Sequence, residues 1–260
     1  MERSSESNQY HTRLLGCSIE VEHARSYWKH VEQLTAEDVT KTAFSEYWFG
    51  ARSKSRVQLL LTNFRERFDA FHPALQVLHR WTQIDAQSRR VICHWHLQLA
   101  DRLYREFTGR WLVERRLSGR TEVARDLVVR WIGELTSDRW MTSTRIQFAR
   151  RLLYSASEAG LLQGKRDARQ LQTPRVSDEA LTYLLYLLRD IQFEGSLPEN
   201  PYLASVGISG RDLERRLRAL PSFRFRKQGD LFEFGWMYDG LLEWAEATVL
   251  SGEEQLRETA

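Results

Sequence analysis

Residues 209–234 read SGRDLERRLRALPSFRFRKQGDLFEF. In the first half, leucines at 213, 217 and 220 follow helical spacing, and Ser209 and Asp212 have the spacing of a capping box. The second half alternates Phe and Arg with period two, passes through Lys-Gln-Gly-Asp and returns as Leu-Phe-Glu-Phe. This pattern predicts a helix at 209–220 followed by a β-hairpin at 223–234.

The elements expected before this stretch extend the pattern. A helix is predicted at 178–192, followed by a connector with two prolines and a short apolar segment at 202–206. Helix, turn, second helix and two-stranded hairpin is the order typical of a winged helix-turn-helix. The C-terminal range, 177–260, is therefore predicted to be a winged-helix domain.

Basic residues cover the predicted outer faces of this module. Arginines on the helix lie opposite the leucines, arginines on the hairpin lie opposite its phenylalanines, and Lys227 is expected at the tip. Such a surface suits contacts with DNA phosphates and groove edges. A helix that only faces solvent also has arginines opposite its leucines, and some winged helices bind proteins instead of DNA. Both alternatives, a merely solvated face and a protein-binding surface, stay open. The candidate DNA contacts here are Arg211, Arg215, Arg216, Arg218, Arg224, Arg226 and Lys227.

Two other segments carry basic residues in similar settings. A helix ending at Gly160 is followed by short apolar runs around a polar loop, which predicts a first hairpin within 161–176. Arg145, Arg150 and Arg151 on that helix either form a second basic surface together with the hairpin or are simply the exposed face of the helix. Near the N-terminus, a helix at 53–71 could be the recognition helix of another helix-turn-helix. The candidate contacts of these two segments are Lys165, Arg166, Arg169, Arg52, Lys54 and Arg56.

Helical periodicity runs through most of the chain. Apolar residues at spacings of three and four predict further helices at 19–34, 88–107, 121–135, 142–160 and 238–249. Thr142 or Ser143 is expected to cap the fourth of these. The predicted fold class is mostly α, with short β-hairpin wings. The expected division is an N-terminal helical region at 1–84, a central helical region at 85–176 and the winged-helix domain at 177–260.

Composition narrows the class of protein. Hydrophobic residues make up 42% and aromatic residues 12% of the 260 residues, as in a packed globule. Five of the 38 basic residues are lysine, so 33 are arginine, the side chain suited to bidentate phosphate and guanine contacts. The net charge is only +3, but residues 209–229 hold seven basic and two acidic side chains. No apolar run is long enough to span a membrane, and two cysteines form no disulfide framework, so a cytoplasmic protein without a membrane partner is expected.

Catalytic motifs are missing from the sequence. It contains no phosphate-binding glycine loop, no G-x-S-x-G and no H-E-x-x-H. In the run Cys93-His94-Trp95-His96, the two histidines would point about 200° apart on a helix, so core positions are expected for them. Asp230 and Glu233 are interpreted as shaping the second hairpin. We therefore expect no enzymatic activity, cofactor, metal or small-molecule substrate.

Residues 150–162, RRLLYSASEAGLL, resemble the helix ending of the BrxA family of BREX bacteriophage-defence systems. The order Leu14-Leu15-Gly16, helix 19–34 and helix 53–71 is also similar. One departure is Cys17, where the family leads us to expect the second of two glycines. The resemblance covers most of the chain and implies a cytoplasmic, non-catalytic helical protein with helix-turn-helix or winged-helix modules and DNA affinity.

These observations support one hypothesis and two alternatives. The first is a non-enzymatic accessory protein of a BREX-like system that binds double-stranded DNA, with other defence components as further partners. The alternatives are a scaffold that holds the defence proteins together and an RNA-binding helical protein of the antitermination-factor type. Salt dependence of nucleic-acid binding separates the first from the scaffold, since phosphate contacts make affinity fall with salt.

Overall fold

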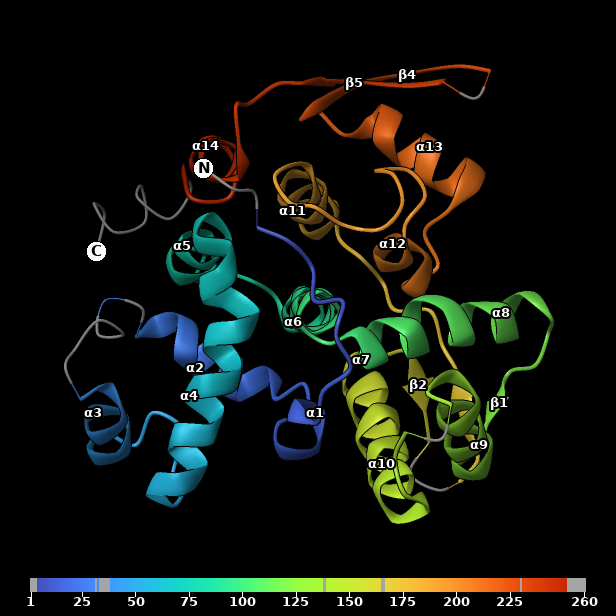
Figure 1. The fold of residues 1–260 in the computed structure, drawn as a ribbon. Coiled ribbons are helices and arrows are strands. Elements are labelled where there is room, and N and C mark those ends of the chain that lie inside the picture. Colours follow the sequence, from blue (N-terminus) through green and yellow to red (C-terminus); the bar gives the residue numbers. More distant parts are fainter. Residues whose placement is uncertain are drawn as a thin grey trace.

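Helices dominate the computed structural model (Figure 1), which describes residues 4–30, 32, 38–137, 139–164, 167–229 and 231–251. The N-terminal helices are α1 (Arg13–Gly16), α2 (Val21–Lys29), α3 (Val39–Ser45), α4 (Lys54–Phe68), the 3-10 turn η2 (Asp69–Phe71) and α5 (His72–Arg80). The later helices are α6 (Ala86–Ala100), α7 (Arg102–Glu106), the π-helical turn η3 (Phe107–Trp111), α8 (Leu112–Leu117), α9 (Arg125–Leu135), α10 (Thr142–Glu158), α11 (Asp178–Arg189), α12 (Pro201–Ser205), α13 (Gly210–Ala219) and α14 (Leu241–Ala247). The prediction of a mostly α fold is confirmed.

Helix α6 lies near the centre of the molecule (Figure 1) and contacts α2, α4, α7, α10 and α11. Its residues from Val91 to Leu99 are all buried, so no face of this stretch meets solvent. The predicted helix at 88–107 is wrong at its end, because the chain is extended at Asp101 (φ −135°, ψ 106°). The Asp101 side chain accepts a hydrogen bond from the Tyr104 amide at 2.9 Å and thereby begins α7.

Two small antiparallel sheets complete the described structure. The first has the strand order β1 (Glu122–Val123), β3 (Arg169–Leu171), β2 (Leu162–Gln163), and the second pairs β4 (Phe223–Gln228) with β5 (Leu231–Trp236). Both predicted hairpins are therefore present, as β2–β3 (the central hairpin) and β4–β5 (the C-terminal hairpin). Strand β1 was not predicted, and it delays the start of α9 from residue 121 to Arg125.

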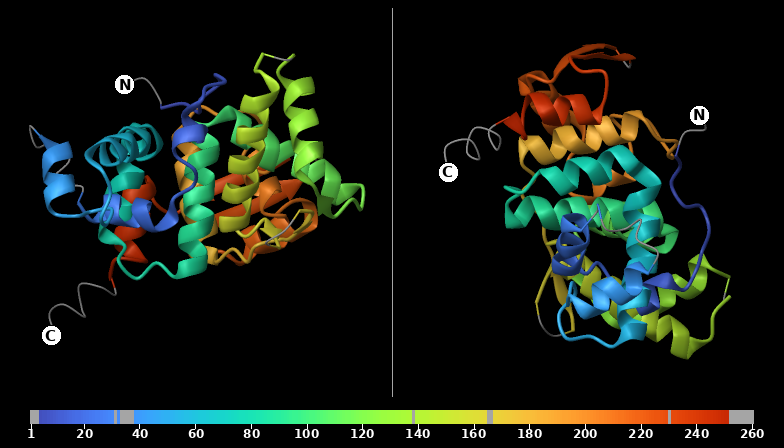
Figure 2. Two further views of the ribbon diagram at one scale, coloured as in Figure 1. Left: turned by 90° about the horizontal axis from the view of Figure 1, so that it is seen from below. Right: turned by 90° about the vertical axis from the view of Figure 1, so that its left-hand side faces the viewer.

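The two hairpins belong to opposite ends of the molecule. In Figure 1 and in the right-hand view of Figure 2, α13 and the C-terminal hairpin lie at one end, and α9, α10 and β2 lie at the other. Helices α11 and α12 and then α6 and α7 lie between them. No helix in the described ranges has the length and apolarity needed to cross a membrane.

Of three helix ends whose capping was predicted, one has the expected structure and two do not. Gly160 adopts a left-handed backbone (φ +80°) and ends α10, with the Leu161 amide bonded to the Ala156 carbonyl at 2.8 Å, as expected. The residue before α10 is Met141, so neither Thr142 nor Ser143 is its cap. Ser209 precedes α13 but makes no side-chain cap hydrogen bond, so the expected capping box is not formed.

Candidate nucleic-acid interface

Helix α13 buries one side and exposes the other. Leu213, Leu217 and Leu220 are at most 3% exposed. Arg211, Arg215 and Arg218, which we call the α13 arginine face, are exposed. The predicted orientation of the helix is therefore confirmed, while contact of these arginines with DNA stays a prediction.

The α13 arginines differ in their partners within the protein. Arg215 pairs with Asp212, and Arg218 lies 3.4 Å from Glu214, but both side chains remain more than half exposed. Arg216 points elsewhere: its guanidinium donates to the Val176 carbonyl at 3.0 Å and to the carboxylate of Asp178, and only 16% of its side chain is exposed. Arg216 therefore ties α13 to the start of α11 and is a poor candidate for contact with a ligand.

The C-terminal hairpin has an apolar face toward the protein and a polar face toward solvent. Phe223 and Phe225 are buried, whereas Arg224 and Arg226 between them are exposed. Lys227 is not at the tip as expected, because it lies in β4 on the phenylalanine side and its ammonium contacts Glu214 of α13 at 2.6 Å. This hydrogen bond lowers the pKa of Glu214, with the charge of Arg218 adding to the effect. Lys227 thus joins the hairpin to α13.

Among the described residues, no carboxylate lies within ion-pair distance of Arg211, Arg224 or Arg226. Glu233, opposite Arg226 in the strand register, is exposed. Asp230 lies outside the described residues. Three exposed guanidinium groups in this region are therefore available to an external anion.

Of the three candidate DNA contacts on the central hairpin, only Arg169 lies within the described residues. Lys165 and Arg166 lie outside the described residues. Arg169 donates to the carbonyl of Leu153 and, at 2.8 Å, to the hydroxyl of Ser157, both on α10. Burial lowers the pKa of Arg169, against the opposing effect of Asp167. Arg169 therefore fastens the hairpin to α10 and does not face solvent freely.

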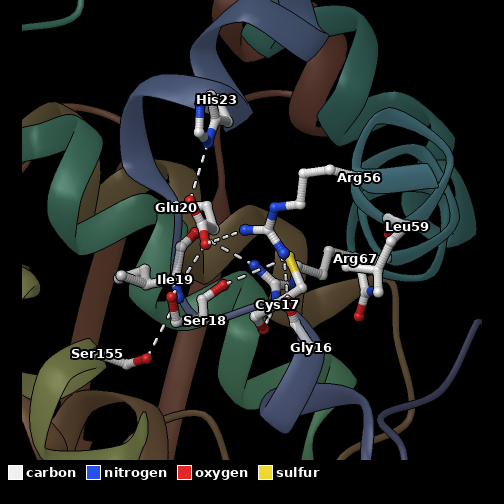
Figure 3. Close-up of polar contacts among 11 residues, drawn as sticks. Gly16, Cys17, Ser18, Ile19, Glu20, His23, Arg56, Leu59, Arg67 and Ser155 are labelled. Atoms are coloured by element: carbon white, nitrogen blue, oxygen red, sulfur yellow. Dashed lines mark hydrogen bonds and ion pairs between the residues drawn. The ribbon is translucent and has the colours of Figure 1, made fainter. Parts of the chain in front are cut away.

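Of the three N-terminal candidate contacts, two are exposed and one is bound within the protein. Arg52 and Lys54 are exposed at the start of α4. Arg56 instead donates to the Gly16 carbonyl and, at 2.7 Å, to the carboxylate of Glu20, as Figure 3 shows. A helical pattern alone could not distinguish this braced arginine from its exposed neighbours.

Arg56 is part of a polar junction around residues 16–20, just before α2 (Figure 3). Arg67 is 3% exposed and donates to the Cys17 and Ile19 carbonyls at 2.7 and 3.2 Å. The Ile19 amide donates to Ser155 of α10 at 3.2 Å. This junction therefore fixes α10 against the N-terminal helices.

Glu20 is the acidic member of the junction. Burial alone would raise its pKa, but a hydrogen bond with His23 and the charge of Arg56 outweigh that effect. The pKa of Glu20 is lowered to about 2. The carboxylate is thus held ionised as a structural group.

The histidines of the 93–96 run are core residues. His94 contacts the hydroxyls of Tyr104 and Ser205 at 2.9 and 2.8 Å, and His96 contacts the Arg67 carbonyl and the Tyr183 hydroxyl at 2.8 and 2.7 Å. Burial lowers their pKa values to about 3 and about 4, which keeps both rings neutral. Within the described part of the chain, no three His, Cys, Asp or Glu residues are placed to hold a metal ion.

The BrxA family model matches residues 8–186. This chain belongs to the BrxA family. Membership of the BrxA family indicates a role in BREX phage defence. No curated protein matches the sequence.

The part of the chain that matches BrxA includes the 16–20 junction, all of α10 and the central hairpin, and it ends within α11. Cys17, where we expected a second glycine in a BrxA protein, is fully buried. Sequence reasoning gave little weight to the exposed side of α10, although residues 147, 150, 151 and 154 have the spacing of one helical stripe. The role of this stripe depends on the position of α10 relative to strand β1, and β1 was not predicted.

Proposed function

We propose that this BrxA-family protein is a cytoplasmic, non-enzymatic accessory protein of a BREX system and binds double-stranded DNA through α13 and the C-terminal hairpin. The observation that carries the proposal is the concentration of exposed guanidinium groups on these two neighbouring elements. The order α11, α12, α13, β4, β5 is that of a winged helix, in which the second helix of the helix-turn-helix enters the major groove.

The chemistry of the surface favours the phosphate backbone. Arginine donates to phosphate oxygens in a planar fork, and its guanidinium is more weakly hydrated than the ammonium of lysine. Arg215 and Arg218 exchange weak surface ion pairs for phosphate contacts, whereas Arg211, Arg224 and Arg226 have no such pair to break among the described residues. We expect binding that depends strongly on salt and weakly on sequence.

The test is fluorescence anisotropy of a labelled duplex DNA over a salt series. For R211Q/R215Q/R218Q, we expect weaker binding and a salt slope smaller by up to about 2.7, which is about 0.9 for each phosphate that the variant no longer neutralises. The control K29Q/K41Q/R90Q removes the same charge at exposed positions of α2, α3 and α6 and should bind like the unmodified protein.

Three outcomes would contradict the proposal. Equal salt slopes for the folded α13 variant and the control would place the contacts elsewhere, with Arg52 and Lys54 as the next candidates. Displacement of the DNA by equimolar duplex RNA would favour the RNA-binding alternative, because A-form RNA has a different groove geometry. Absence of binding to either nucleic acid would favour the scaffold.

A further inference from the structure

The central part of the chain has a second helix–hairpin arrangement, which we call the central unit: α8, β1, α9, α10, β2 and β3. Strand β3 lies between the other two, with Gln170 opposite both Glu122 of β1 and Gln163 of β2. Helix, strand, helix, helix and hairpin, with the first strand joined to the hairpin, is also a winged-helix order. In this order α10 occupies the place of the recognition helix.

Helix α10 exposes a stripe with the chemistry of a DNA-reading surface. Gln147, Arg150, Arg151 and Tyr154, which we call the α10 stripe, are exposed, and Tyr154 is 45% exposed. These side chains donate hydrogen bonds to phosphates and base edges. In the described structure neither Arg150 nor Arg151 has a carboxylate at ion-pair distance, so both are available to a ligand.

The opposite side of α10 is held by packing and by hydrogen bonds to two other parts of the chain. Phe148, Leu152 and Ser155 are fully buried. Ser155 accepts from the Ile19 amide of the junction in Figure 3, and Arg169 of the central hairpin donates to Leu153 and Ser157. The stripe is therefore presented by a helix held from two directions, which lowers the entropic cost of binding a rigid partner.

The stripe and the α13 arginine face belong to opposite ends of the molecule. The views in Figures 1 and 2 agree that α11 with α12, and then α6 with α7, lie between α13 and α10. The α10 stripe and the α13 arginine face are therefore two separate surfaces.

We infer that the α10 stripe is a second binding surface for duplex DNA, and that one molecule bridges two duplexes. This inference rests on the proposed function of the α13 arginine face and adds a second, independent site. Two binding sites on one molecule hold two duplexes close together and so raise the effective concentration of one duplex near the other.

The experiment is a bridging assay. A short biotinylated duplex on beads is loaded with protein, washed, and offered a fluorescent duplex of another sequence. We expect the unmodified protein to retain the fluorescent duplex. R150Q/R151Q and R211Q/R215Q/R218Q should each still bind the beads but fail to retain the fluorescence, whereas K29Q/R90Q should bridge normally. Circular dichroism checks that each variant is folded.

A mixture of the two variants separates bridging by one molecule from bridging by associated copies. If single molecules bridge, the mixture stays inactive, because no molecule in it has both surfaces. Retained fluorescence with R150Q/R151Q alone or with the mixture would overturn the inference, since associated copies would then supply the two sites. An unmodified protein that binds the beads without bridging would overturn only this inference, and one that does not bind the beads would overturn the proposed function.

Discussion

The central hairpin and the C-terminal hairpin each follow a helix, but different interactions hold them in place. The central hairpin has strands of two and three residues, and Arg169 ties it to α10 through hydrogen bonds. The C-terminal hairpin has strands of six residues, and aromatic packing holds it against α11. There Tyr186 lies 5.4 Å from the ring of Phe223 and 4.8 Å from that of Trp236.

This difference shows that one order of elements can be stabilised in two ways. A long hairpin buries enough aromatic area to be held by packing, whereas a short one needs a third strand and a charged side chain. The C-terminal hairpin should therefore respond most to loss of volume, and the attachment of α10 should respond to loss of charge or hydrogen bonds.

The largest expected effect is from truncating the aromatic packing of the C-terminal hairpin. Phe223 is 5% exposed and stacks on Tyr186, so F223A should lower the free energy of unfolding by about 3–5 kcal/mol in urea denaturation. F232A, near the turn of the same hairpin and only partly buried, is the control and should lower it by about 1 kcal/mol. Similar losses for the two variants would show that packing at Tyr186 does not anchor the hairpin.

The same difference explains what could be predicted from the sequence. The C-terminal hairpin was predicted because Phe223 to Arg226 alternate over a strand with one buried face. Strand β1 has two residues, too few to show any period. The break at Asp101 was missed because the apolar pattern of α6 continues into α7.

The site could be predicted only in part. The exposed face of α13 follows from helical spacing relative to its leucines. The spacing does not reveal which arginines find partners on other elements, and Arg56, Arg169 and Arg216 do so through carbonyl groups brought close by the tertiary fold. Lys227 was misplaced because β4 extends through residue 228, one position past it.

The next effect concerns the charge at the junction that holds α10. The pKa of Glu20 is lowered in the folded protein to about 2 from its ordinary value of 4.5. Its contribution to stability is therefore complete above about pH 4.5 and is lost as the pH falls toward 2. E20Q should lower the free energy of unfolding at neutral pH by at most about 3 kcal/mol, and should remove the part of the pH dependence that lies between those values.

Urea denaturation of E20Q at several pH values measures this effect. The buried histidines His94 and His96 also destabilise the folded protein on acidification, from their ordinary pKa of 6.5 down to their folded values of about 3 and about 4. Because both E20Q and the unmodified protein keep these histidines, the difference between their two pH profiles isolates Glu20. E66Q is the matched control, since Glu66 pairs with Arg13 on the surface, where both side chains are more than 40% exposed. A pH profile of E20Q parallel to that of the unmodified protein would contradict the role of Glu20.

The smallest expected effect on stability is from removing one arginine, and it is tested by comparing an arginine from each hairpin. Arg169 on β3 donates to two groups of α10, but burial of its guanidinium offsets part of that gain, so R169M should lower the free energy of unfolding by about 1 kcal/mol. Arg224 on β4 is exposed, and R224M should leave stability unchanged within about 0.5 kcal/mol. Urea denaturation of both variants measures the difference. Methionine keeps most of the apolar stem, so the comparison isolates the hydrogen bonds of the guanidinium. If R169M is as stable as R224M, the third strand β1 alone is sufficient to hold the central hairpin against α10.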